Sequence, residues 1–377
     1  MKIAIVCYPT FGGSGVLATE LGKALADKGH EIHLITYQQP VRLTGFHANL
    51  YYHEVRVPTY PLFDYPPYET ALASAMVDVV LNHGIELLHV HYAIPHASAA
   101  YMAKQILKKQ GKSIRVITTL HGTDITLIGR DTTYKPVVTF SMEESDILTA
   151  VSESLKQDTY RNFDISKPIE VLYNFVDLRR FANTRADEIK KMVSPQGEKI
   201  IIHASNFRKV KRLEDVIRVF MNIEKKIPAR LLLIGDGPER PHLESLTREY
   251  ENCGKIRYLG KQEQIEAILP AGDLFLLPSE TESFGLAALE AMAAGLPVIS
   301  TNAGGLPEVN INGKCGYMSA VGDVEDMSRN ALKILSDEKT LAAFREEAIK
   351  QSKKFDIGVI VPQYEALYER VRTSSSS

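Results

Sequence analysis

Short apolar segments recur along the whole chain, and most of them are followed by a helix-like stretch. The first, Ile3–Cys7, is a continuous apolar run of the length expected for a buried strand. A glycine-rich turn follows it, and then a helical stretch with Leu17, Leu21 and Leu25 on one face. The next strand is predicted at Ile32–Thr36. A strand, a helix and a second strand in this order predict a βαβ unit, and therefore a parallel sheet.

The same alternation continues in two series, which predicts two domains. The first series continues with candidate strands at Tyr52–Val57, Leu87–Tyr92, Arg115–Leu120, Ile147–Val151 and Glu170–Tyr173. A polar, helix-like segment at Leu178–Met192 interrupts the pattern. The second series has candidate strands at Ile200–Ala204, Arg230–Ile234, Ile256–Leu259, Leu274–Leu277 and Val298–Thr301. We therefore expect an α/β fold of two Rossmann-like, doubly wound domains that face an interdomain cleft.

The interruption sets the expected domain boundaries. Residues 1–177 form the first domain and residues 178–355 the second. A helix over 356–371 has no strand after it, and we expect it to pack back on the first domain, followed by a disordered tail over 372–377. A long connection, Pro58–Tyr68, is rich in proline and aromatic residues and is expected to be an ordered loop over a cleft.

The composition excludes several classes of protein. The 377 residues include 44 basic and 46 acidic side chains, so a formal charge of −2 provides no field that would attract nucleic acid or an anionic membrane. No apolar run is long enough to span a bilayer, and the N-terminus reaches Tyr8 and Pro9 too soon for a signal peptide. The three scattered cysteines are typical of cytosolic thiols. We expect a cytoplasmic protein without nucleic-acid or membrane partners.

A four-residue segment, Gly12-Gly13-Ser14-Gly15, lies between the first strand and the helix that follows it. Glycines at such a place let backbone N–H groups approach an anion at the helix N-terminus. The spacing is not GxGxxG, and the second strand ends in Thr36-Tyr37-Gln38, without an acid for a ribose hydroxyl. A dinucleotide cofactor is therefore disfavoured, and a plain tight turn is the alternative.

Histidines mark two other strands of the first domain. His121 begins a His-Gly-Thr-Asp segment at the carboxyl end of a strand, where it could donate to a sugar hydroxyl or a phosphate. A capping or backbone-bonding role is the alternative. His89 and His91 share a face of their strand, which favours packing over metal binding.

The second domain carries the strongest signals. Residues 206–212, which follow its first strand, include four cations in five positions that could clamp a diphosphate, although a solvated basic loop is the alternative. Further on, a buried strand ends at Pro278 and a loop leads into an apolar helix whose first N–H groups, from Phe284 to Leu286, would face an anion. Glu290 is the only charge in that helix, and a ribose diol could bond both of its oxygens. Glu282 would sit nearer a sugar.

Two absences bear on the chemistry. The sequence contains no Asp-x-Asp pair, which makes a carboxylate-bound Mg²⁺–nucleotide less favoured. It also lacks GxxxxGK[ST], which excludes an ordinary P-loop NTPase. We expect neither a metal nor a cofactor.

On these residues the chain resembles the retaining family 4 glycosyltransferases of the GT-B fold. Glu282 and Glu290 match the E-x7-E motif of that family, and Gly235–Pro238 and the Gly304-Gly305 pair before Glu308 fit as well. The resemblance covers essentially the whole chain. Within the family, the chain is most similar to those members that transfer N-acetylglucosamine from UDP-N-acetylglucosamine to the hydroxyl of L-malate. That transfer is the first step of bacillithiol biosynthesis.

The resemblance implies that the first domain binds the acceptor and the second domain the UDP-sugar. The implied catalytic residues are His121, Glu282, Lys211 and Arg208. The implied donor-binding residues are Gly15, Asn206, Ser283, Phe284, Gly285, Leu286 and Glu290. Position alone suggests an acceptor-binding set of Gly13, Ser14, Tyr92, Thr119, Lys135 and Arg42. The partners would be the two small-molecule substrates, and a homodimer is left open.

Other functions remain open at this stage. Many family members carry Arg where this chain has Asn206, so the diphosphate clamp would depend on Arg208 instead. The same donor site could serve a different acceptor, such as inositol phosphate, a sugar or a lipid. A UDP-sugar 2-epimerase has a similar two-domain plan, although the E-x7-E segment disfavours it. A non-catalytic nucleotide-sugar or glycan-binding protein would bind UDP without turnover.

Overall fold

The chain folds into two compact units. The computed structural model describes residues 1–377 except 11–12, 58–64, 128–130, 183–185, 251–252 and 374–377. Unit 1 comprises Met1–Asn174 and the C-terminal segment from Gly358, and unit 2 comprises Phe175–Ile357. Gly12, most of the expected Pro58–Tyr68 loop and most of the expected 372–377 tail lie outside the described residues.

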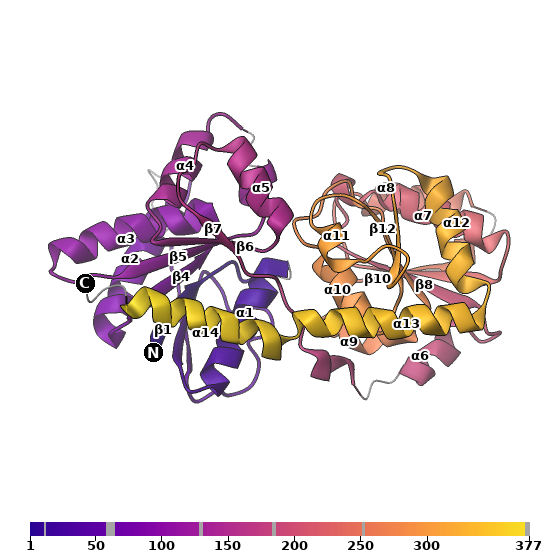
Figure 1. The fold of residues 1–377 in the computed structure, drawn as a ribbon, viewed down its shortest axis with the longest axis horizontal. Coiled ribbons are helices and arrows are strands. Elements are labelled where there is room, and N and C mark those ends of the chain that lie inside the picture. The colour runs from indigo at the N-terminus through magenta and orange to yellow at the C-terminus, as the bar shows by residue number, and fades with distance from the viewer. Residues whose placement is uncertain (11–12, 58–64, 128–130, 183–185, 251–252, 374–377) are drawn as a thin grey trace. The chain divides into compact units, whose positions relative to one another are not determined.

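Unit 1 is built on a parallel sheet with helices on both faces (Figure 1). Within the described residues the sheet has seven strands in the order β3-β2-β1-β4-β5-β6-β7. The strands are β1 (Lys2–Val6), β2 (Glu31–Thr36), β3 (Leu50–Glu54), β4 (Leu87–His91), β5 (Arg115–Leu120), β6 (Ile147–Ala150) and β7 (Ile169–Val171). The helices are α1 (Gly13–Asp27), α2 (Tyr68–His83), α3 (Ser98–Lys109), α4 (Lys135–Glu143), α5 (Glu153–Asn162) and α14 (Ile357–Thr373).

Alternation along the strands decides which helices cover each face. On β1, Ala4 and Val6 belong to a buried cluster with side chains of α2 and α3. Ile5 points the other way, toward α1, where a side chain added at Gly22 would meet Ile5 at 3.6 Å. From the same face, His89 on β4 bonds the hydroxyl of Tyr368 on α14 at 2.8 Å. Both faces of the central strands β1 and β4 are therefore buried, which explains the apolar run of β1.

Unit 2 repeats this architecture. Its sheet has the order β10-β9-β8-β11-β12-β13. The strands are β8 (Lys199–Ala204), β9 (Ala229–Ile234), β10 (Ile256–Gly260), β11 (Leu274–Leu277), β12 (Val298–Thr301) and β13 (Gly316–Ser319). The helices are α6 (Ala186–Val193), α7 (Leu213–Glu224), α8 (Arg240–Arg248), α9 (Ile265–Ile268), α10 (Leu286–Ala293), α11 (Leu306–Val309), α12 (Val324–Leu335) and α13 (Glu338–Ser352).

Two details of unit 2 differ from the sequence expectation. Strand β13 was not predicted, because its four residues begin with glycine and lack a continuous apolar run. The expected helix over Leu178–Met192 is instead a 3-10 turn at Leu178–Phe181 and the separate helix α6. The doubly wound α/β fold of both units is nevertheless the one predicted.

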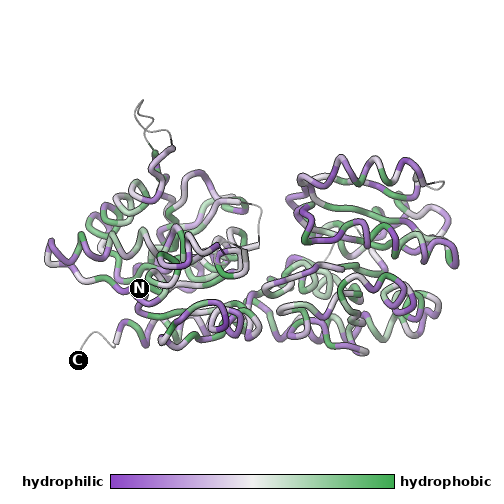
Figure 2. Tube along the Cα trace, turned by 90° about the horizontal axis from the view of Figure 1, so that it is seen from above, coloured by the Kyte–Doolittle hydropathy of each residue, from purple (hydrophilic) through white to green (hydrophobic). Residues whose placement is uncertain are grey.

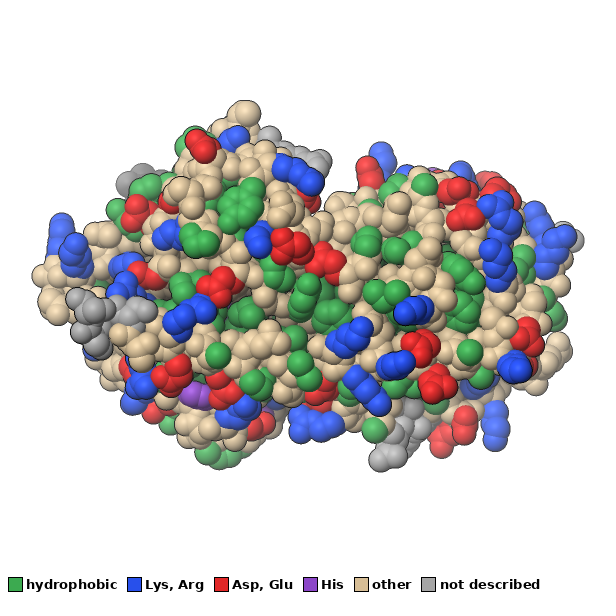
Figure 3. All heavy atoms as spheres, viewed as in Figure 1, with side chains coloured by type: hydrophobic (Ala, Val, Ile, Leu, Met, Phe, Trp, Pro, Cys, Tyr) green, Lys and Arg blue, Asp and Glu red, His purple; other side chains and the backbone are tan. Residues whose placement is uncertain are grey.

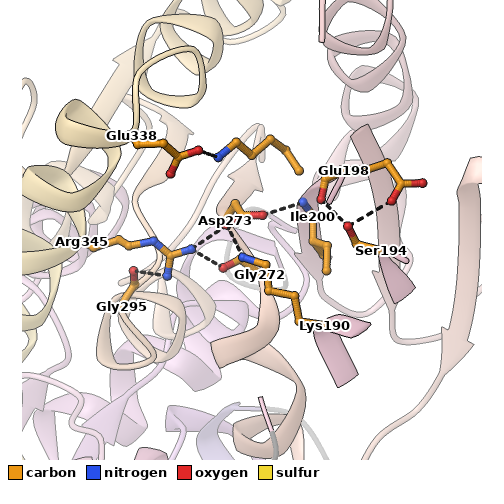
Figure 4. A network of polar contacts seen from close by, with 10 residues as sticks. Lys190, Ser194, Glu198, Ile200, Gly272, Asp273, Gly295, Glu338 and Arg345 are labelled. Carbon is orange, nitrogen blue, oxygen red and sulfur yellow. Dashed lines mark hydrogen bonds and ion pairs between the residues drawn. The ribbon is translucent and has the colours of Figure 1, made fainter. Parts of the chain in front are cut away.

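A buried carboxylate fixes the start of the second sheet (Figure 4). Asp273, which is 2% exposed, precedes β11 and accepts the backbone N–H of Ile200 on β8 at 2.8 Å. Its other oxygen pairs with Lys190 of α6 at 2.9 Å and with Arg345 of α13 at 2.8 Å. Because one side chain joins two strands and two helices, it holds the central strands of unit 2 in register.

The strand order places candidate sites at one edge of each sheet. In unit 1 the order reverses between β1 and β4, and in unit 2 between β8 and β11. Loops that leave the carboxyl ends of such strand pairs diverge to opposite faces and leave room for a ligand between them. The loops after β1, β4, β8 and β11 are therefore where functional side chains are expected.

The helices and the drawn surface show a mixed distribution of apolar and charged residues. Figure 2 shows hydrophobic and hydrophilic residues alternating along the helices, as expected for helices that cover a sheet. On the face drawn in Figure 3, acidic and basic side chains are interspersed. Among the described residues, none of the helices has the length and apolar character needed to cross a membrane.

Candidate active site

An ion pair stands at the switch point of unit 2. Lys211, in the loop after β8, donates from Nζ to Oε1 of Glu282, in the loop after β11, at 2.5 Å. The side chains are 21% and 13% exposed, respectively. Ser279 donates to the same carboxylate oxygen at 2.8 Å. The two predicted catalytic residues, 71 positions apart in sequence, thus meet where the fold leaves room for a ligand.

A glycine pair holds the backbone beside Glu282. The N–H of Gly305 donates to the carbonyl oxygen of Glu282 at 2.8 Å. Gly304 has φ +58°, and a Cβ there would lie 2.0 Å from that same oxygen. A Cβ at Gly305 would lie 2.5 Å from the carbonyl oxygen of Ser283. Only residues without a side chain fit this contact, so the Gly304-Gly305 pair sets the position of the Glu282 loop.

The basic loop of unit 2 divides into residues with different roles. Phe207 is fully buried and anchors the loop, against which Gly237 packs without room for a Cβ. Asn206 and Arg208 on either side of it are exposed. Arg212 is held by Asp215, to which its Nε donates at 2.6 Å. Of the four cations predicted as a clamp, Lys211 is therefore paired with Glu282 and Arg212 with Asp215.

The start of α10 supplies backbone donors. Gly285 precedes the helix with φ +97°, and Leu286 is its first residue. The first N–H groups of a helix have no acceptor within it. Phe284 is a core side chain, 5.5 Å from Phe355 between ring centroids, so its ring is not exposed to a ligand. Ser283 and Glu290 are both partly exposed.

A histidine that the sequence analysis did not single out lies behind the ion pair. His203, fully buried on β8, contacts the carbonyl oxygen of Leu276 through Nδ1 at 2.8 Å and Ser205 Oγ through Nε2 at 2.7 Å. Burial lowers its pKa to about 4, and the nearby Lys211 acts in the same direction. The imidazole is therefore neutral at physiological pH and orients Ser205 at the edge of the site. Its position near the end of β8 is the signal that could have identified it.

In unit 1, the predicted acceptor residues Ser14 and Tyr92 meet at the switch point. Their hydroxyl groups lie 2.7 Å apart, with Ser14 in the first turn of α1 and Tyr92 directly after β4. Gly15 packs against the loop after β1, since a Cβ there would lie 2.3 Å from the carbonyl oxygen of Tyr8. Gly13 is exposed at the start of α1.

His121 is part of a histidine cluster at the same edge. Its Nε2 lies 2.7 Å from Nδ1 of His91, and the two rings stack 5.0 Å apart. Burial lowers the pKa of His121 to about 3, so this imidazole is neutral. The Nε2 atoms of His91 and His96 are buried and find no hydrogen-bond partner among the described residues. His91 is buried, and its contact with His121 supports the ring of His121.

Two further residues of this edge were not named as site residues. Asp124, the last residue of the His-Gly-Thr-Asp segment, accepts the N–H of Ala93 at 2.9 Å and that of Gly122 at 3.0 Å. It thereby ties the loop after β5 to the loop after β4. Tyr8 packs its ring 4.5 Å from His96 and 5.4 Å from Tyr92. Both residues follow the carboxyl ends of strands, and that position is the signal that marks them.

The remaining acceptor candidates lie in different settings. Thr119 is fully buried, and its hydroxyl bonds His89 and Thr149, each at 2.7 Å, so its side chain belongs to the interior network. Lys135 is exposed at the start of α4, with Nζ 6.0 Å from the ring centroid of Phe163. Arg42 lies in the loop after β2, next to Val41, whose N–H bonds the carbonyl oxygen of Pro9 at 3.4 Å.

Comparison with known proteins identifies the family of the chain. Residues 11–180 match the model of Glycosyltransferase Family 4, and residues 184–351 match that of Glycosyl transferases group 1. The N-acetyl-alpha-D-glucosaminyl L-malate synthase of Bacillus anthracis is 46% identical over 370 residues, which are 98% of this chain and 96% of the relative.

Solved structures show the same fold at lower identity. Sucrose-phosphate synthase from Thermosynechococcus elongatus has a TM-score of 0.83 and 21% identity, with 99% of this chain and 100% of that chain covered. Anabaena HepE in complex with UDP-glucose has a TM-score of 0.82 and 18% identity, with 98% and 100% covered. The whole-length relative, the two family models and the doubly wound architecture place the chain among the family 4 glycosyltransferases with the GT-B fold.

Proposed function

We propose that the chain transfers N-acetylglucosamine from UDP-N-acetylglucosamine to the hydroxyl of L-malate with retention of the α-configuration. The identity of 46% over nearly the full length of a relative named for this product supports the choice of substrates. The observation that carries the proposal within the molecule is the Lys211–Glu282 pair at the switch point of unit 2. It joins a cation suited to a diphosphate with a carboxylate suited to sugar hydroxyls.

Unit 2 would bind the donor. The diphosphate would lie at the start of α10, where N–H groups and the helix dipole favour negative charge. Lys211 would neutralise it from the loop after β8, with the exposed Arg208 as a second cation. Glu290, one turn into α10, would accept hydrogen bonds from the ribose hydroxyls. Asn206 and Ser283 would border the same site.

Glu282 would bind a hydroxyl of the transferred sugar. Its carboxylate already accepts from Lys211 and Ser279, so one oxygen is held in place before a sugar arrives. An ionised carboxylate accepts several hydrogen bonds at once, and a sugar hydroxyl is a suitable further donor. Positioning of this kind lowers a barrier because the reacting group no longer has to find its orientation.

Unit 1 would bind the acceptor. L-malate carries two carboxylates and one hydroxyl, so its pocket needs cations and donors. Ser14 and Tyr92 offer hydroxyl groups at the switch point of unit 1, and Arg42 and Lys135 are the cations proposed from their loops. The neutral imidazole of His121 would donate to the transferred sugar rather than repel or attract a charge.

The proposed step needs no covalent intermediate. The bond between the anomeric carbon and the β-phosphate oxygen breaks, and a bond from that carbon to the malate oxygen forms on the same face. The malate hydroxyl proton passes to the departing phosphate oxygen, so the products are UDP and the α-glycoside. A double displacement would require a carboxylate nucleophile at the anomeric carbon, whereas Glu282 and Glu290 are assigned to hydroxyl groups. The protein would act by stabilising charge on UDP through Lys211 and Arg208.

The test is the release of UDP from UDP-N-acetylglucosamine with and without L-malate. Inositol phosphate and glycerate serve as control acceptors. We expect release only with malate, together with a product of the mass of glycosylated malate. Release with inositol phosphate would assign a different acceptor, and UDP released without any acceptor would indicate an epimerase or a hydrolase. Binding of UDP with no turnover under any condition would refute transfer.

A matched pair of variants separates the two substrates. Lys211→Met removes the proposed diphosphate cation and should weaken UDP binding about tenfold or more, since a hydrogen bond to a charged group contributes about 1.5–3 kcal/mol. Lys135→Ala should raise the KM for malate and leave UDP binding unchanged. An unchanged KM for malate would remove Lys135 from the acceptor site without affecting the donor assignment.

A further inference from the structure

A second histidine cluster lies in unit 1, apart from the residues assigned to the reaction. His33 is on β2, His53 on β3 and His83 at the end of α2. One ring nitrogen from each side chain lies within 4.8 Å of the other two. Parallel pairing of β2 with β3 sets Ile35 opposite His53, so His53 lies two residues further along this face than His33. The helix α2 covers that face and ends at His83, which brings the third ring to the pair.

A carboxylate fixes the tautomer of the buried member. His33, which is fully buried, contacts Oε1 of Glu31 through Nε2 at 3.1 Å. A carboxylate only accepts hydrogen bonds, so the proton of the neutral ring is on Nε2. Its Nδ1 therefore carries the lone pair, and this atom lies 2.8 Å from Nε2 of His53. Metal-binding histidines usually have this arrangement: one ring nitrogen donates its hydrogen to a carboxylate, and the lone pair of the other nitrogen binds the metal.

The neighbours keep the rings neutral and oriented. His33 stacks on Tyr51 at 4.9 Å and on His53 at 5.0 Å, and His83 lies 4.7 Å from His33 and 5.0 Å from His53 between ring centroids. Burial lowers the pKa of His53 to about 4, with His33 and His83 acting in the same direction and Asp78 opposing them. Burial also lowers the pKa of His33. Neutral imidazoles are the form that binds metals.

We propose that His33, His53 and His83 form a binding site for a divalent transition-metal ion of the zinc type. Imidazole nitrogens suit Zn²⁺, Cu²⁺, Ni²⁺ and Co²⁺, and three of them with one open position form a tetrahedral site. Tetrahedral bonds of about 2.0–2.1 Å place ligand nitrogens about 3.3 Å apart. The pair at 2.8 Å has to open slightly and the widest gap, 4.8 Å at most, has to close. His83 can move, because its side chain reaches solvent at the end of α2.

The fourth ligand would be water, since His83 is at the solvent side of the cluster and His33 at its buried side. The ion would tie β2 and β3, at the edge of the sheet, to the last turn of α2. It takes no part in the proposed sugar transfer, none of whose residues belongs to this cluster. The proposal therefore stands or falls independently of the proposed function.

The experiment titrates the metal-stripped, untagged full chain with Zn²⁺ by calorimetry and with Co²⁺ by visible absorption, whose d–d bands report the coordination geometry. We expect one ion per chain with a tetrahedral Co²⁺ spectrum. His53→Gln and His83→Gln should each weaken binding at least tenfold. Glu31→Gln should weaken it about tenfold or more while keeping the same spectrum, because it removes the outer support and the exposed pair with Lys2 but no ligand.

His242→Gln is the matched control. That histidine is also solvent-exposed and paired with a carboxylate, Glu214 at 2.8 Å, but it lies in unit 2. Its binding should equal that of the unchanged chain. Circular dichroism establishes that each variant is folded, and the buried His33 is left intact for this reason. The proposal would be overturned if the unchanged chain showed no saturable binding. It would also be overturned if His53→Gln and His83→Gln bound the metal as tightly as the unchanged chain.

Discussion

Replacement of Gly304 by alanine offers the sharpest test of how the donor site is built. The new Cβ would lie 2.0 Å from the carbonyl oxygen of Glu282, whereas such contacts in real structures stay above 3.0 Å. The neighbouring atoms are backbone, so no flexible side chain can give way. The Glu282 loop therefore has to move by about 1 Å, and the hydrogen bond from Gly305 to the same oxygen, 2.8 Å long, is strained or lost.

A displacement of about 1 Å in a positioning group can reduce a rate about a hundredfold, which corresponds to about 2.7 kcal/mol of transition-state stabilisation. We expect Gly304→Ala to lower kcat/KM for UDP-N-acetylglucosamine by about that factor. The assay is malate-dependent UDP release at saturating malate. Binding of UDP alone, measured by calorimetry, should change much less, because Glu282 is assigned to the sugar and not to the nucleotide.

Gly313→Ala is the control for the backbone effect. Gly313 has φ +74°, close to the +58° of Gly304, so both substitutions carry the left-handed penalty of about 1–2 kcal/mol. No atom lies within 4 Å of a Cβ at Gly313. Gly304→Ala should lose more stability than Gly313→Ala in chemical denaturation, because only Gly304→Ala adds a clash with backbone to the shared left-handed penalty. Only Gly304→Ala should lose activity. Full activity in Gly304→Ala, or equal losses in both variants, would refute the assignment of the glycine pair.

Four other perturbations test separate parts of the structure. Glu282→Gln should lower kcat sharply while UDP still binds in calorimetry, and normal turnover would remove its assigned role. Tyr92→Phe breaks the bond to Ser14 and should raise the KM for malate several-fold at constant UDP affinity; a changed UDP affinity would contradict the acceptor assignment. Asp273→Ala leaves Lys190 and the N–H of Ile200 without their carboxylate. The free energy of unfolding should therefore fall by about 3 kcal/mol. A loss below about 1 kcal/mol would show that the network is dispensable. Acid should destabilise the fold from about pH 6.5 downward, because burial lowers the pKa of His89 to about 3 and that of His203 to about 4. The unfolded chain binds these protons first, so each histidine removes about 1.4 kcal/mol per pH unit down to its folded pKa. Equal denaturation midpoints at pH 6.5 and 5 would contradict this.

The central strands of the sheets were predictable because they are buried on both faces. Strand β5 and strand β11 were predicted at the residue limits that the structure shows, since each is a compact run of apolar and β-branched residues. Strand β13 was not, because Gly316 and the partly exposed Tyr317 and Met318 give no such run. Its pairing with β12 comes from the tertiary structure, which local sequence does not encode.

The sequence predicted which loops carry the candidate site residues, but it did not predict which of these residues contact one another. Sequence reasoning placed Glu282 and Lys211 near a sugar and a diphosphate, and it treated them separately. Their contact at 2.5 Å depends on the order of β8 and β11 in the sheet, which strand prediction leaves undetermined. For the same reason the contact between His91 and His121 was not predicted, because His121 follows the next strand of the sheet. Contacts between loops depend on the order of the strands in the sheet. Candidate site residues can therefore be named from sequence, whereas their contacts require the structure.

Backbone strain marks the same loops independently of any motif. Among the described residues, the non-glycine residues with positive φ are Arg42, Tyr92 and Arg212, at +72°, +85° and +50°. Each follows the carboxyl end of a parallel strand, and each conformation costs about 1–2 kcal/mol for an L-residue. Tyr92 is kept there by its hydroxyl bond to Ser14 and by its N–H, which donates to the carbonyl oxygen of Thr119 at 2.9 Å. Strain persists in a fold only where surrounding contacts oppose it. Because Tyr92 is held from both its side chain and its backbone, its hydroxyl is fixed at the switch point before an acceptor arrives, which is what the proposed acceptor site requires.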